Sequence, residues 1–149
     1  MTGVQTCALP ICSVYDEYKE RLPENWRRRA EHWYTEQERV VAGAEAWRRG
    51  DIEEYGRLSF ASGNSSIYNW ETGSPELKKL YDIMTQTDGI YGGRFSGAGF
   101  KGCCMALIDP AYREQINEKV TREYLKAFPE LEGKYSSYFC QSADGVMYL

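Results

Sequence analysis

The residues with the clearest chemical potential form one glycine-rich stretch, Ser96-Gly97-Ala98-Gly99-Phe100-Lys101-Gly102. Glycine permits positive φ and lets the backbone approach another group closely, and successive backbone amides can form an anion-binding concavity. Lys101 adds a positive charge that either holds a phosphate or is solvated. From these residues alone, a phosphate-binding turn and a tight hairpin without a ligand are equally good interpretations.

The same stretch fits the GxGxxG expression from Gly97 to Gly102. In a dinucleotide-binding fold that loop opens a helix, whose N-terminal amides hold the pyrophosphate. Here it precedes the apolar run Cys103–Ile108, which has the pattern of a strand. The glycine loop of protein kinases does lie between two strands, but no lysine-bearing third strand or catalytic loop follows this one. Sequence context therefore excludes both of these nucleotide folds.

The flanking segments predict an α+β domain in which helices cover an antiparallel sheet. Gly50 ends the first long helix, and Asp51 with Glu54 forms a capping box for the next. The expected helices begin at Pro23, Asp51, Pro75 and Asp109. The segment Gly63–Gly73 is expected to be a polar, aromatic loop. The expected strands are Ile90–Phe95, Cys103–Ile108 and Tyr135–Gln141.

Composition limits the partners and the compartment. A formal net charge of −4 argues against nucleic acid or an anionic membrane as the main partner, and no apolar run is long enough to span a bilayer. The cysteine count of five is odd, Cys103 and Cys104 are adjacent, and His32 is the only histidine. These features argue against a disulfide framework or a bound metal, and they favour a reducing cytoplasm.

Residues 1–12 do not have the character of a folded segment. They lack the basic start and the apolar stretch of a signal peptide, and they resemble the translation of a sequencing-library adapter. We therefore expect the natural sequence to begin near Ser13 and the domain to comprise residues 13–149.

Four segments resemble, in order and spacing, the galactokinase family of the GHMP kinases. Gly89–Cys103 reads GIYGGRFSGAGFKGC and is similar to the family's third signature motif, GVYGARMTGGGFGGC. The other segments are Arg29–Arg39, Gly56–Leu77 and Gln141–Gly145. Within the second of these, Ser65–Glu71 is closer to galacturonokinase-like relatives, which leaves the sugar open.

The resemblance implies the C-terminal domain of a cytoplasmic sugar kinase. Such an enzyme uses ATP and Mg²⁺ to phosphorylate the anomeric hydroxyl of galactose or of a related sugar, such as galacturonate or arabinose. By position, Ser96–Gly102 would line the ATP and sugar site, with Ala98 and Lys101 in place of usual glycines. Gly99→Val would then lower activity far more than stability. The family's GLSSSA phosphate loop and catalytic aspartate are not found, which implies a missing N-terminal domain as partner and an inactive fragment.

A non-catalytic ferredoxin-like module that binds a ligand or regulates another protein is the alternative. An RNA-binding version would use Tyr91, Arg94, Phe95 and Phe100, but the acidic net charge and the long leading helices count against it. Trp26, Trp33 and Trp47 recur at helical spacing along the first long helix and form a tryptophan stripe. If a domain is missing, we expect an exposed apolar patch that includes part of this stripe. Glu36 and Glu71 either orient loops on the substrate side or have surface and capping roles.

Overall fold

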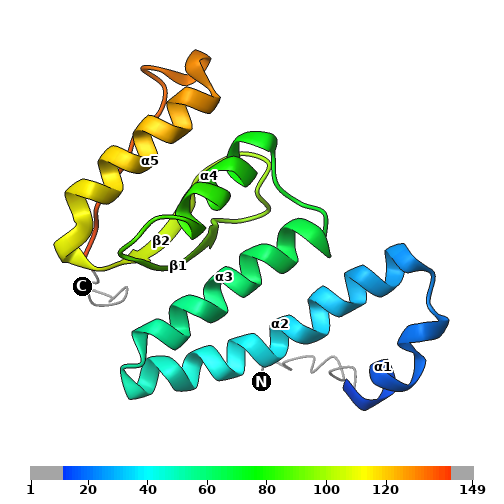
Figure 1. Ribbon diagram of the computed structural model, residues 1–149. Helices are drawn as coiled ribbons and strands as arrows, with labels where there is room; N and C mark the ends of the chain where they lie inside the picture. The colour runs from blue at the N-terminus through cyan, green and yellow to red at the C-terminus, as the bar shows by residue number, and fades with distance from the viewer. Residues whose placement is uncertain (1–11, 142–149) are drawn as a thin grey trace, which may run out of the picture.

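The computed structural model describes residues 12–141 (Figure 1). In this part of the chain, five α-helices accompany a two-stranded antiparallel sheet. The helices are α1 (Cys12–Tyr18), α2 (Glu24–Arg49), α3 (Ile52–Tyr68), α4 (Pro75–Thr85) and α5 (Arg113–Ala127). The strands β1 (Ile90–Phe95) and β2 (Cys104–Ile108) lie between α4 and α5, and single 3₁₀ turns occur at Lys19–Arg21, Pro110–Tyr112 and Pro129–Leu131.

The predicted helix boundaries are confirmed where capping chemistry defines them. Gly50 ends α2 in the left-handed conformation, with φ 71°. The Asp51 carboxylate then accepts a hydrogen bond of 3.1 Å from the backbone N–H of Glu54, which starts α3. Ser74 caps α4 in the same way. Side-chain caps of this kind satisfy amides that have no partner within the helix, and each typically contributes about 1 kcal/mol.

The elements form successive layers, with α2 and α3 side by side, α3 against β1, and α4 between the sheet and α5 (Figure 1). One face of α4 joins α3 and β1 in a cluster of Ile67, Leu77, Tyr81, Met84 and Phe95. Its other face packs on α5 in a second cluster of Ile83, Ile116, Val120 and Tyr124. Because α4 contributes side chains to both clusters, it connects the two halves of the core. Burial of each large apolar side chain contributes about 1.5–3 kcal/mol to the free energy of folding.

Two glycines bring the backbone of α3 into contact with that of β1. A Cβ atom on Gly56 would lie 2.2 Å from the carbonyl oxygen of Tyr91, and one on Gly92 would lie 2.2 Å from the carbonyl oxygen of Gly56. Real Cβ contacts are never this short, so only glycine fits at either position. This close approach fixes β1, and the loop that follows it, against α3.

The predicted loop at Gly63–Gly73 is wrong in its first half, because α3 continues to Tyr68. The serines that suggested a loop are buried, and the Ser66 hydroxyl donates a 3.0 Å hydrogen bond to the carbonyl oxygen of Ser62 within the helix. Gly63 lets α3 approach the ring of Tyr81 on α4. The polar residues of this segment therefore belong to a buried part of α3, where a serine hydroxyl bonds to the helix backbone, and not to a solvated turn.

The predicted strand at Tyr135–Gln141 is also wrong, because this segment forms no regular structure. Its aromatic side chains attach it to α5 instead. The ring of Tyr135 lies 5.1 Å from that of Tyr124, and the Arg113 guanidinium lies over the ring of Phe139. The predictions for residues 1–11 and for Ala143-Asp144-Gly145 lie outside the described residues.

The apolar stripe of α2 is largely exposed. Val40, Val41 and Trp47 are each at least half accessible to solvent, as predicted for part of the tryptophan stripe. Val40 and Trp47 join Tyr55 and Leu58 of α3 around a groove of about 580 Å³. Among residues 12–141, no helix is sufficiently long and apolar to cross a membrane.

Candidate functional site

The seven predicted site residues form a single loop between β1 and β2. The backbone N–H of Ser96 donates a 2.9 Å hydrogen bond to the carbonyl oxygen of Cys103, which closes the loop at its base. Gly97, Gly99 and Gly102 have φ values of 80°, 79° and 108°. Ala98 does not have positive φ, so alanine is accommodated there without backbone strain.

The inner side of the loop rests on the core. Phe95 is only 3% exposed, and the adjoining backbones of Gly73 and Gly99 both lie against its ring. A Cβ atom on Gly99 would lie 2.4 Å from this ring. The carbonyl oxygen of Gly99 also accepts a 2.6 Å hydrogen bond from the N–H of Ser74. Gly99 is therefore needed for packing, and Gly99→Val would lower stability more than its sequence position alone suggests.

The outer side of the loop is open. A Cβ atom on Gly97 would meet no other heavy atom within 4 Å, and Ala98 and Lys101 are exposed. Phe100 is 63% exposed, which is unusual for a large aromatic side chain. The loop therefore presents glycine-rich backbone, one cationic side chain and one aromatic ring to its surroundings. Such a surface suits a flat, anionic ligand such as a nucleotide.

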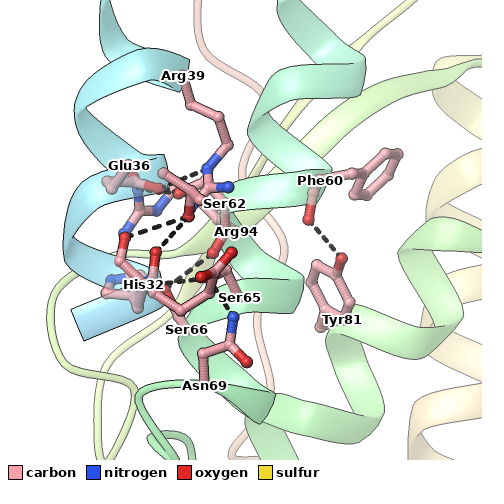
Figure 2. A network of polar contacts seen from close by, with 12 residues as sticks. His32, Glu36, Arg39, Phe60, Ser62, Ser65, Ser66, Asn69, Tyr81 and Arg94 are labelled. Carbon is pink, nitrogen blue, oxygen red and sulfur yellow. Dashed lines mark hydrogen bonds and ion pairs between the residues drawn. The ribbon is translucent and has the colours of Figure 1, made fainter. Parts of the chain in front are cut away.

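A polar network joins α2, α3 and β1 (Figure 2). Glu36 of α2 accepts hydrogen bonds at Oε1 from Ser62 (2.5 Å) and Arg94 (2.9 Å), and at Oε2 from Arg39 (2.8 Å). Arg94 precedes Phe95 on β1, so the network holds the strand from which the loop departs. Sequence reasoning did not identify Arg94 or Ser62 as members of this network.

Ionisation in the network follows from burial and from its hydrogen bonds. Burial raises the pKa of Glu36, but the hydrogen bonds from Ser62 and Arg39, with the charges of Arg39 and Arg94, outweigh it and hold the pKa below its ordinary value. Burial lowers the pKa of His32, whose Nδ1 lies 2.9 Å from the Ser65 hydroxyl. Glu36 is thus an ionised anchor, and His32 is a packed, neutral histidine.

Glu36→Gln is expected to destabilise the fold by about 1–3 kcal/mol at pH 7, because it removes the charge that accepts hydrogen bonds from the partly buried Arg39 and Arg94. The pKa of Glu36 is lower in the folded state, so its stabilisation is complete above the unfolded pKa of about 4.3 and is lost as the pH falls through the folded value. Urea unfolding of both proteins from pH 3 to 8 measures this. The difference in the free energy of unfolding between wild type and variant should stay constant above about pH 6 and become smaller below about pH 4. Equal free energies of unfolding at pH 7 would exclude a stabilising role for the Glu36 carboxylate.

Residues 44–127 match the family described as GHMP kinases C terminal. The chain belongs to the GHMP kinase family, and its helices and small antiparallel sheet are those of a galactokinase C-terminal domain. The predicted family and fold class are confirmed.

Three of the proteins that the chain resembles are sugar kinases. The chain is 43% identical to a galacturonokinase from Arabidopsis thaliana over 141 residues, covering 92% of this chain and 33% of that protein. It is 31% identical to a galactokinase from Canis lupus familiaris, covering 88% and 32%. The structure of Lactococcus lactis galactokinase complexed with galactose matches with a TM-score of 0.73 and 26% identity, covering 78% and 30%. The chain therefore spans about a third of the length of the curated relatives it matches.

Proposed function

We propose that the chain is the C-terminal part of an ATP-dependent kinase that phosphorylates the anomeric hydroxyl of a galactose-related sugar, with galacturonate as the preferred acceptor. The observation that carries this proposal is the open, glycine-rich loop Ser96–Gly102 in a chain 43% identical to a galacturonokinase. The segment Ser65–Glu71, which resembles galacturonokinase-like relatives, favours galacturonate over galactose and arabinose.

In this proposal the loop supports the nucleotide through its backbone. Phosphoryl transfer depends mainly on positioning and on electrostatic stabilisation of the phosphate oxygens. ATP supplies the transferred phosphoryl group. The open side at Gly97 and Ala98 would let the backbone approach it, and Lys101 would add a positive charge. Residues 12–141 contain no group of three or more His, Cys, Asp or Glu side chains that could hold a metal ion.

The groove between α2 and α3 would receive the N-terminal domain of the same protein. The relatives are about three times as long as this chain, which provides an occupant for the groove. Its apolar wall is Val40, Trp47 and Leu58, and Arg39 and Arg94 lie at its edge. The isolated chain would be inactive, because one loop cannot position ATP, metal and sugar together.

Kinetic assays on the full-length protein test this function. ATP would be offered with galacturonate, galactose or arabinose, and formation of the sugar 1-phosphate would be followed. We expect the highest kcat/KM with galacturonate and no turnover by the 149-residue chain alone. Absence of turnover with all three sugars would favour a non-catalytic binding module. Higher activity with galactose would retain the kinase and overturn the choice of sugar.

Lys101→Ala is expected to raise the KM for ATP only about two- to fivefold, with kcat unchanged. The Lys101 side chain is exposed, and a flexible ammonium offers a point charge without fixed geometry. An exposed charge contact of this kind is typically worth less than about 1 kcal/mol. Steady-state kinetics on the full-length protein measure the change, with Lys126→Ala on the exposed end of α5 as the control. A loss of kcat beyond about tenfold would instead assign Lys101 to the phosphoryl transfer step.

A further inference from the structure

An ion-pair cluster connects the first half of α2 to the segment between α3 and α4. The two carboxylate oxygens of Glu71 accept hydrogen bonds from different residues, Arg28 (2.5 Å) and Arg29. Arg29 also donates a 2.8 Å hydrogen bond to the carbonyl oxygen of Asn69. We call Arg28, Arg29 and Glu71 the arginine clamp. It holds the connecting segment at two points, one on its backbone and one on a side chain.

The backbone at Glu71 has an unusual conformation. Its φ is 59°, and it is the only residue other than glycine with positive φ in residues 12–141. Positive φ is sparsely populated in residues with a Cβ atom, and glutamate has no special tolerance for it. The conformation therefore depends on the surrounding contacts, and the clamp is the contact made by the strained residue itself.

The segment that follows Glu71 forms the support for the glycine loop. Thr72 is fixed to the carbonyl oxygen of Ser66 by its backbone N–H and by its hydroxyl, both at 3.0 Å. Gly73 then lies against the ring of Phe95, and Ser74 donates its N–H to the carbonyl oxygen of Gly99. Ser74, which makes this direct hydrogen bond to the loop, is only three positions after Glu71.

We propose that Glu71 is a positioning residue for the loop Ser96–Gly102. Held by Arg28 and Arg29, it fixes the connection on which Gly99 rests, and it thereby sets the position of the open side of the loop. The importance of this position for catalysis rests on the proposed function, whereas the mechanical link between clamp and loop does not.

The clamp is placed to control position more than overall stability. Its three side chains are each between 36% and 43% exposed, and exposed ion pairs contribute little to the free energy of unfolding. The hydrogen bond from Arg29, with the charges of both arginines, holds the pKa of Glu71 below its ordinary value, so the carboxylate stays ionised at neutral pH. Loss of the clamp should therefore release the loop while the two core clusters remain intact.

Limited trypsin digestion of the full-length protein without ligand tests the mechanical link. Lys101 is an exposed cleavage site within the loop, and the cleavage rate in the native state follows the population of the opened loop. Glu71→Gly removes the carboxylate but tolerates φ of 59°, whereas Glu71→Gln keeps the size and removes the charge. The control is Glu54→Gln, which breaks the exposed Glu54–Arg57 pair on α3.

Both Glu71 variants are expected to be cleaved after Lys101 about tenfold faster, with melting temperatures within a few degrees of wild type, while the control is unchanged. The kcat/KM for sugar phosphorylation should fall by a similar factor, mainly through KM. Unchanged cleavage at Lys101 in both variants would overturn the proposal, as would faster cleavage throughout the chain in step with a lower melting temperature. If the wild-type protein phosphorylates no sugar, the proposed function fails, and the digestion still decides the role of the clamp.

Discussion

Gly97→Val in the full-length protein is expected to lower kcat/KM for sugar phosphorylation by about 100-fold, the loss typical of small displacements at a reacting centre. The added side chain would project into the open space beside the loop, where a Cβ atom meets no protein atom within 4 Å. Under the proposed function, that space belongs to the nucleotide or to the domain that binds it. Steady-state kinetics and thermal melts of the same preparations measure the two effects separately.

Gly133→Val is the matched control for this experiment. Gly133 has φ of 75° and open surroundings, as Gly97 does with φ of 80°, but it lies in the turn after α5. Both substitutions should incur a similar backbone cost of about 1–2 kcal/mol. Only Gly97→Val should lose activity beyond what its melting temperature explains. Equal kinetic effects of the two variants would show that the loop is a structural hairpin.

Gly56→Ala is expected to destabilise the domain by about 3 kcal/mol or more, at the upper end of the range for overpacking. An alanine Cβ would lie 2.2 Å from the carbonyl oxygen of Tyr91, and neither α3 nor β1 has a flexible side chain at the contact that could move aside. Separating the two elements would also shift the glycine loop and disturb the Glu36–Arg94 network.

Gly43→Ala gives the opposite expectation for another glycine inside a helix. A Cβ atom there would make ordinary contacts of 3.7 Å and more with Tyr55 and Leu58. Without a clash, the helical preference of alanine should stabilise α2 by about 0.5–1 kcal/mol. Urea unfolding measures both variants. If Gly56→Ala were as stable as wild type, α3 and β1 could not be packed backbone to backbone.

Local chemistry allowed much of this fold to be predicted from sequence. The capping residues Gly50, Asp51 and Ser74 mark helix boundaries through hydrogen bonds within a few residues, and these predictions are confirmed. The apolar runs on both sides of the glycine loop predict that it lies between two strands, and the structure shows this arrangement. Its role as a ligand site stays a prediction.

Long-range contacts explain what sequence reasoning missed. The polar serines in the second half of α3 predict a loop, yet Ser65 and Ser66 are buried, with Ser66 bonded within the helix and Ser65 bonded to His32 of α2. On α2, the polar residues Arg29, His32 and Glu36 follow helical spacing, and their side chains contact α3, its C-terminal cap or β1. Arg39 continues this spacing and pairs with Glu36. That regular polar spacing was the available signal for the network. Arg94 could not be assigned to it without knowing that the Arg94 side chain on β1 reaches Glu36 on α2.

Hydrogen–deuterium exchange of the full-length protein tests the central claim most directly. Exchange would be compared with and without a non-hydrolysable ATP analogue and galacturonate. The account predicts slower exchange of the backbone amides in Ser96–Gly102 when both ligands are present, and no change in the turn around Gly133. Unchanged exchange throughout Ser96–Gly102, in a preparation that phosphorylates the sugar when given ATP, would contradict the assignment of this loop to the active site.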